Sequence, residues 1–214
     1  MSWVENSAKN LLPLSNEKKA FSTALREWLY DGDMFDLENP IEACELCEHP
    51  EIRYQFKIVN RFNGNELLVG SECINKFGIT ATDDLGNVLS RDASRKKVSK
   101  DRRHLVTEAR KKRQINSLVR LAGIDKDFEI SAFIDYVQDR GAFTPNQLSL
   151  LFWRFEKNRI SYNSLDFKVV IRRDREKNQL RIMPKWKLRQ ILPSLSVSQR
   201  VWIERPEENI SPNE

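Results

Sequence analysis

The residues of this 214-residue chain best suited to chemistry are its cysteines. Cys44 and Cys47 form a Cys-x-x-Cys pair, His49 follows two residues later, and Cys73 ends the sequence Gly-Ser-Glu-Cys. They are all three cysteines of the chain and one of its two histidines. Two thiolates three residues apart can bind one metal ion from a tight turn, and tetrahedral zinc takes four sulfur or nitrogen ligands. The spacing therefore predicts a Zn²⁺ site formed by Cys44, Cys47, His49 and Cys73.

The fourth ligand of this site has alternatives. His49 is favoured because the Cys-x-x-Cys turn already bends the chain around the metal. His104 is the alternative, brought in by tertiary contact, and Glu48 or Glu51 could supply an oxygen instead. Four protein ligands would leave no position for water or substrate, so we expect a structural zinc. Without a metal, the cysteines would be buried thiols or a redox pair, but a thioredoxin-type pair needs a βαβ pattern that the sequence lacks.

The elements that must position these ligands are a hairpin and a short helix. Residues 53–59 alternate as a strand does, Asn63-Gly64 is a hairpin turn signal, and residues 66–69 form the return strand. A break at Gly70-Ser71 then places Cys73 in the first turn of a helix that ends near residues 77–78. In this order of turn, hairpin and helix-borne ligand, residues 41–80 resemble a treble-clef zinc finger.

This resemblance covers about a fifth of the chain and concerns arrangement. It implies a small finger held by zinc. The usual treble clef takes two cysteines from its helix, whereas this chain has Lys76 at the second position. An ammonium group has no lone pair for a metal, so the missing ligand must come from elsewhere.

Positive charge is concentrated in one segment. The chain has a net charge of +5, but residues 95–120 carry eleven Lys or Arg against Asp101 and Glu108, which leaves the remainder of the chain negative. A basic segment of this kind is typical of proteins that bind polyanions, most often nucleic acid. The alternative is a solvated helix face without a ligand. The expected nucleic-acid-binding residues are Arg95, Lys96, Lys97, Lys100, Arg102, Arg103, Arg110, Lys111, Lys112 and Arg113.

The remaining pattern predicts an α+β fold. Helices are expected at 16–29, at 94–121, at 131–140 and from Thr144-Pro145 onward. Alternation at 166–172 and an apolar return at 180–183 predict a C-terminal β-hairpin, followed by a short helix at 185–191. We expect an N-terminal helical segment (1–40), a zinc finger (41–80), a linker with the basic helix (81–125), a C-terminal α/β segment (126–205) and a flexible tail (206–214).

The same sequence favours a cytoplasmic protein without membrane contact. It has no run of eighteen apolar residues and no secretory signal, and an odd cysteine count argues for reduced thiols. Phosphate-binding loops, nucleophile elbows and His-Glu-x-x-His motifs are absent, so no enzyme class is indicated, although a magnesium-dependent nuclease without a signature stays open.

We therefore expect a non-enzymatic, zinc-stabilised nucleic-acid-binding protein that contacts mainly the phosphate backbone, with DNA favoured over RNA. Bacterial and phage accessory proteins of DNA metabolism often have this combination of features. Stacking of bases on Tyr54, Phe56 or Phe62 is a second contribution, but a small finger needs such aromatic side chains for its own core. The rival interpretation is a protein interaction factor, an adaptor or inhibitor that uses the finger as a scaffold.

Overall fold

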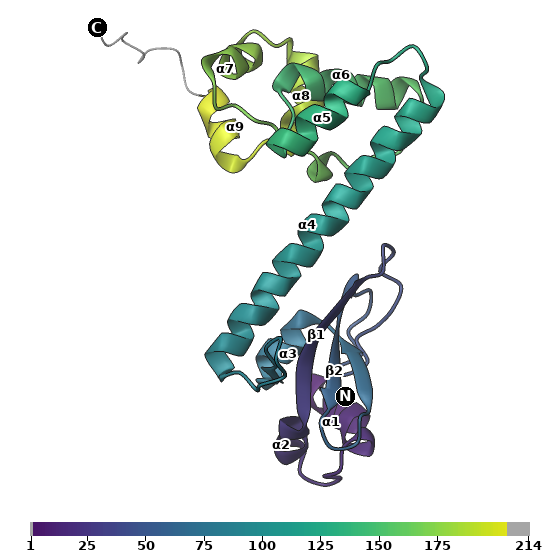
Figure 1. Ribbon diagram of the computed structural model, residues 1–214, viewed down its shortest axis with the longest axis vertical. Coiled ribbons are helices and arrows are strands. Elements are labelled where there is room, and N and C mark those ends of the chain that lie inside the picture. Colours follow the sequence, from purple (N-terminus) through teal and green to yellow (C-terminus); the bar gives the residue numbers. More distant parts are fainter. Residues whose placement is uncertain (1, 205–214) are drawn as a thin grey trace, which may run out of the picture. The chain divides into compact units, whose positions relative to one another are not determined.

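The computed structural model describes residues 2–204, and the chain divides into two compact units between Ala109 and Arg110. The boundary falls inside the long helix α4 (Arg91–Ile124), so α4 belongs partly to each unit (Figure 1). The segments at 1–40 and 41–80 share one hydrophobic core within the N-terminal unit. The expected tail at 206–214 lies outside the described residues.

The N-terminal unit is a small sheet with helices. Its strand order is β3-β2-β1-β4, with β1/β2 and β2/β3 antiparallel and β1/β4 parallel. In Figure 1, β1 and β2 run side by side and α3 lies next to them. Besides α4, the elements of this unit are α1 (Trp3–Leu11), η1 (Leu12–Leu14), α2 (Phe21–Ala24), η2 (Leu25–Glu27), β1 (Trp28–Asp36), β2 (Tyr54–Asn60), β3 (Glu66–Val69), α3 (Ser71–Phe77) and β4 (Thr80–Ala81).

One face of this sheet builds the core of the unit. Side chains two residues apart on a strand share a face, and here Tyr30 pairs with Ile58 while Phe56 pairs with Val69, so all four lie on one side. All four are fully buried, together with Val98 of α4. The core therefore joins the sheet to the first half of the basic helix.

The expected helix at 16–29 is wrong at both ends, because residues 16–20 are not helical and residues 28–29 belong to a strand. Only α2 and the 3-10 turn η2 are helical, and Trp28 begins strand β1. The Trp28 ring is fully buried and its Nε1–H donates to Ser15 Oγ (2.8 Å). Pairing of Trp28 with Asn60 across the sheet therefore outweighs the helical spacing of the apolar residues.

The hairpin and the short helix of the finger are confirmed. β2 and β3 pair around the turn at Asn63-Gly64, where Gly64 has φ +74°. Helix α3 starts after Gly70 and ends at Gly78, which adopts the left-handed conformation that favours glycine (φ +65°). The basic helix is also confirmed, and α4 extends beyond the expected 94–121 at both ends.

The C-terminal unit is helical around a second core of Phe and Leu side chains. The predicted helices at 131–140 and 145 onward are confirmed, and Thr144 forms a capping box with Gln147. Phe143, Phe152, Phe155 and Phe167 are fully buried. The elements after α4 are α5 (Ser131–Arg140), α6 (Pro145–Lys157), η3 (Ser164–Asp166), α7 (Asp174–Arg181), α8 (Lys185–Ile191), η4 (Leu192–Ser194) and α9 (Val197–Glu204).

The predicted C-terminal β-hairpin is wrong. Residues 167–172 are extended but form only one bridge, Val169 with Phe143, and the expected turn and return strand are helix α7. The Glu176 carboxylate accepts hydrogen bonds from the backbone N–H groups of Arg172 and Arg173 and so caps this helix. The apolar residues that alternate at 167–171 are buried by packing, as Phe167 and Val169 show, and not by pairing with a second strand. The α+β class is nevertheless confirmed.

None of the helices within residues 2–204 combines the length and apolar character that a membrane span requires.

Glu27 provides a test of the N-terminal fold. Its buried carboxylate accepts hydrogen bonds from Asn16 N–H (2.7 Å), Glu17 N–H (2.8 Å) and Asn60 Nδ2 (2.8 Å). Burial alone would raise the pKa of Glu27, but the hydrogen bonds outweigh it and the pKa lies below the ordinary 4.5. The ionised form thus stabilises the fold above that pH, and this contribution is lost as the pH falls through the folded-state pKa.

We expect Glu27→Gln to lower the stability of the N-terminal unit by about 1–3 kcal/mol near neutral pH. The amide group of Gln would replace one carboxylate oxygen, which now accepts hydrogen bonds, by an N–H donor. The difference from the wild type should shrink below the ordinary pKa of 4.5. Hydrogen exchange of the β1 and β2 amides, at neutral pH and below pH 4.5, measures this difference in stability. A deficit that does not change with pH would contradict the assigned role of the charge.

Candidate functional site

The Cys44/Cys47 pair and Cys73, which lies 26 residues after Cys47, come together in the structure. Cys73 Sγ lies 3.2 Å from Cys47 Sγ and 3.6 Å from Cys44 Sγ, and all three side chains are buried. Tetrahedral coordination with metal–sulfur distances of about 2.3 Å would place the sulfurs about 3.8 Å apart. A disulfide would need about 2.05 Å. The cluster could therefore hold a metal ion.

A tight turn positions the first two sulfurs. The Cys44 N–H donates to the His49 carbonyl (2.9 Å), and the Glu48 N–H donates to the Cys44 carbonyl (2.8 Å). Glu48 adopts a left-handed conformation (φ 61°), which turns the chain back after Cys47. These bonds close the turn from 44 to 49 around the sulfurs.

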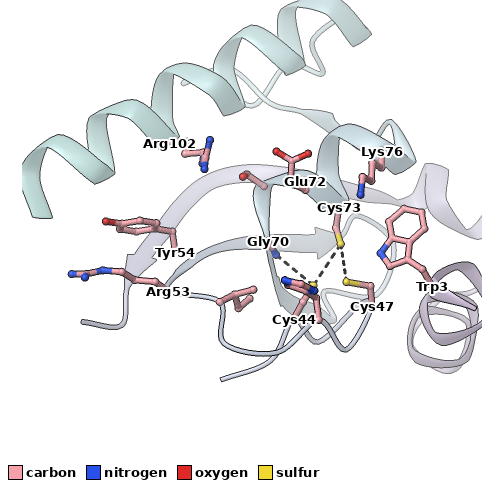
Figure 2. A pocket seen from close by; sticks show the side chains of 13 residues that line it. Trp3, Cys44, Cys47, Arg53, Tyr54, Gly70, Glu72, Cys73, Lys76 and Arg102 are labelled. Carbon is pink, nitrogen blue, oxygen red and sulfur yellow. Dashed lines mark hydrogen bonds between the residues drawn. The ribbon is translucent and has the colours of Figure 1, made fainter. Parts of the chain in front are cut away.

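The hairpin and α3 position the third sulfur. Gly70, directly after β3, donates its N–H to Cys44 Sγ (3.4 Å), and Cys73 lies in the first turn of α3 (Figure 2). The Glu45 N–H donates to the Leu68 carbonyl (3.0 Å), which ties the cysteine turn to β3. The order of turn, hairpin and helix-borne ligand expected from the sequence is therefore present.

The electrostatics of the cluster favour a bound cation. The hydrogen bond from Cys73 lowers the pKa of Cys44 to about 5 against the effect of burial, and backbone N–H groups, including that of Gly70, add to this. The same hydrogen bond, burial and the charge of Cys44 raise the pKa of Cys73. One thiolate thus keeps its neighbour protonated. Only a cation among the sulfurs allows all of them to be thiolates, and metal binding releases the protons.

The structure brings together the three cysteines but not a complete set of four ligands. His49 is exposed and lines the same pocket, but its ring nitrogens are not part of the group whose ligand atoms lie within 4.8 Å of one another. His104 is exposed on α4 and does not line this pocket. Glu48 accepts a hydrogen bond from Asn10 (3.2 Å) and contacts Lys9. His49 as the fourth ligand stays a prediction.

A pocket of about 350 Å³ opens beside the sulfurs. Figure 2 shows Glu72 and Lys76 on α3, Trp3 on α1 and Arg102 on α4 around it. The Trp3 ring stacks on Phe77 (centroids 4.3 Å apart), and Lys76 Nζ lies 5.0 Å from the Trp3 centroid. The pocket therefore combines cations and aromatic rings next to the candidate metal centre.

Sequence reasoning missed Trp3 as a pocket residue. Ser2 and Glu5 form a capping box that starts α1, the helix carrying Trp3. The Ser-x-x-Glu spacing was the signal that could have placed a helix there. The packing of the Trp3 ring on Phe77 is a tertiary contact that no local sequence pattern indicates.

The expected nucleic-acid-binding cations separate into two groups. Lys97 Nζ lies 3.3 Å from Asp101 and 5.9 Å from the Tyr30 centroid, so it is partly buried against the sheet. Lys111, Lys112 and Arg113 also have interaction partners. Six others are exposed and form no ion pair within residues 2–204. These are Arg95, Lys96, Lys100, Arg102, Arg103 and Arg110.

Arg113 has a structural role inside the C-terminal unit. Its Nε and Nη2 donate to the two oxygens of Asp166 (2.7 and 2.6 Å), and the Asp166 side chain is only 3% exposed. Such a bidentate pair fixes the guanidinium. Arg113 is thus already engaged by a carboxylate, and a phosphate would have to displace it.

We expect Arg113→Gln to destabilise the C-terminal unit by about 3 kcal/mol, because it leaves the buried Asp166 carboxylate without its partner. Arg110→Gln removes the same charge from an exposed position and should change stability by no more than about 0.5 kcal/mol. Hydrogen exchange of amides in residues 145–167 reports on this unit alone. Equal effects of the two substitutions would show that the ion pair is not structural.

Known proteins give no guide to this chain. Comparison with protein-family models, curated proteins and solved structures finds no match. The resemblance of residues 41–80 to a treble clef thus rests on the arrangement of the hairpin, α3 and the three cysteines.

Proposed function

We propose that the protein is a zinc-stabilised nucleic-acid-binding protein that contacts mainly the phosphate backbone. The three clustered sulfurs support the metal, and the exposed cations of α4 support the polyanion. DNA is the favoured ligand, in an accessory role rather than a catalytic one. The zinc ion stabilises the finger, and α4 provides the binding surface.

Zinc is the metal that the donor set favours. Thiolates are soft ligands, and tetrahedral sites with several cysteines are typical of structural zinc. The buried cysteines lie in a closed turn and the first turn of a helix, which suits a structural ion. Because Cys73 comes near Cys44 and Cys47 only when the hairpin and α3 are folded, binding of zinc contributes directly to folding.

The observation that carries the nucleic-acid proposal is the charge on the first half of α4. Arg95, Lys96, Lys100, Arg102 and Arg103 are exposed and form no ion pair with any acid in residues 2–204. Asp101, the acid in this stretch, is turned toward Lys97 and the Tyr30 hydroxyl (3.1 Å). Cations without carboxylate partners are available for phosphate, which supplies most non-specific affinity.

For the metal, we expect about one zinc ion per folded chain. Cys44→Ser, Cys47→Ser and Cys73→Ser should each abolish stoichiometric zinc and unfold the finger, because ligand loss removes folding energy. Elemental analysis and hydrogen exchange of the β2 and β3 amides measure both effects. Folded protein purified without chelator that holds no zinc would contradict this assignment.

The two histidines of the chain form a matched pair for the fourth ligand. His49→Ala should weaken zinc binding measured in competition with a chelator, whereas His104→Ala should leave it unchanged. The reverse result would assign His104 as the ligand. Equal affinity of both variants and the wild type would exclude both imidazoles from the site.

For nucleic acid, we expect fluorescence anisotropy to show affinity for a labelled oligonucleotide that falls at least about 100-fold between about 50 and 200 mM salt, as for about five phosphate contacts. A variant with Gln at Arg95, Lys96, Lys100, Arg102 and Arg103 should lose most of this salt dependence. The reason is that fewer counterions are released when fewer phosphates are neutralised.

A control variant should remove the same charge elsewhere. Lys19, Arg26, Lys168, Lys185 and Arg189 are exposed, and no ion pair involves them in residues 2–204. Their replacement by Gln should leave affinity within a few-fold of the wild type. Binding that is absent or independent of salt would refute the proposal. If the chain binds no nucleic acid but co-purifies with one acidic protein in a stoichiometric complex, the chain is a protein interaction factor.

A further inference from the structure

Some exposed cations of the N-terminal unit line hollows of its surface. Besides the pocket at the sulfurs, two further hollows lie where α3 faces α4. One is lined by Asn75, Lys76, Arg95 and Ser99, and the other includes Asn75, Ser99 and Arg102. Arg102 also lines the pocket beside the cysteines. The three hollows therefore share lining residues and follow one another along α3.

The geometry of α4 explains which cations reach this groove. Arg95, Ser99 and Arg102 are spaced by four and three residues, so they lie on one face of the helix. Arg103, four residues after Ser99, also lines one of the hollows. Lys96 and Lys100 lie on the outward face and line none of these hollows. One helix thus offers two kinds of cation with the same charge and different surroundings.

We propose that this α3/α4 groove and the pocket beside the metal centre bind one single strand of nucleic acid, with phosphates along the groove and a base in the pocket. The proposal rests on the proposed function and adds the form of the ligand and its path. Lys76, Arg95 and Arg102 neutralise phosphates, and Ser99 offers a hydroxyl donor.

The pocket favours a single strand over a duplex. Bases in a duplex are stacked inside the helix, whereas bases of a single strand can enter a recess and stack on aromatic rings. Half-buried Tyr54 lines the pocket, with Arg53 Cζ 5.4 Å from its ring centroid. The volume of about 350 Å³ lies within the range of small-ligand pockets, and it includes the space beside the three cysteines that a metal ion would take.

Two further side chains indicate a ligand with hydrogen-bond donors. Asn75 lines both hollows at α4, and its Oδ1 is buried without a hydrogen-bond partner within residues 2–204. A buried acceptor without a donor is costly. Glu72 is a carboxylate in the same groove. Both can accept from amino or imino groups of bases, but the charge of Glu72 opposes nearby phosphates.

The test uses the full, zinc-loaded chain and a fluorescein-labelled oligo(dT) of about twelve nucleotides, within the site sizes of single-strand binders. A mixed-sequence duplex of equal length is the comparison. We expect the single strand to bind more tightly. Arg95→Gln and Arg102→Gln should each weaken it about fivefold more than the outward controls Lys96→Gln and Lys100→Gln, because all four remove one charge but only two lie in the groove.

Two more variants test the pocket. Tyr54→Leu should weaken oligo(dT) about tenfold and leave duplex binding unchanged, because only the single strand offers a base for stacking. Glu72→Gln should tighten binding of oligo(dT) several-fold, since it removes the negative charge. Zinc content equal to that of the wild type confirms that each variant is folded.

The outcomes separate this inference from the proposed function. If binding depends on salt but groove and outward variants lose equal affinity, the groove is not the path and only the general proposal survives. Preference for the duplex, with no effect of Tyr54→Leu, would also overturn the inference. If neither oligonucleotide binds at low salt, both proposals fail together.

Discussion

Burial of three sulfurs in one place is the constraint on which the N-terminal unit depends. Thiolates at 3.2–3.6 Å repel one another, and without a cation the pKa values of Cys44 and Cys73 move apart. A metal ion bound here would remove this conflict and join three pieces of chain: the turn at 44–49, the end of β3 and the start of α3. Apolar contacts hold the same pieces together, because Leu46, Val69 and Ile74 are buried in one core with the cysteines.

The position of α3 in turn gives the charges of α4 their different roles. Val98, Lys97 and Asp101 lie toward the sheet. The hollows next to α3 are lined by Arg95, Arg102 and Arg103, whereas Lys96 and Lys100 line none of them. A count of charges along the sequence treats all of them alike. Whether a cation has a carboxylate partner depends on tertiary structure, as the pair of Arg113 and Asp166, 53 residues apart, demonstrates.

The parts of the fold that could be predicted are those with strong local signals. Asn63-Gly64, Gly78 and Thr144-Pro145 set a turn, a helix end and a helix start by their own backbone preferences. The failures lie where a tertiary contact decides. Trp28 fits a helical stripe but is buried in a strand against Ser15, and the alternation around Val169 is satisfied by packing rather than by a β-hairpin. The Cys-x-x-Cys spacing of Cys44 and Cys47 is itself a local signal, and the turn signal of the hairpin predicted that Cys73 would return to it.

Lys76 connects the metal centre to the proposed binding surface. It stands where the usual treble clef has its second helix cysteine, and the first-turn Cys73 fixes its direction on α3. Its ammonium group lies against Trp3 and lines two of the hollows. Compared with the usual treble clef, an ammonium at this position cannot bind a metal ion but places a positive charge at the same edge of the helix. In the proposed function, this departure from the zinc-finger pattern is therefore what allows a structural ion to sit directly beside a surface for phosphate.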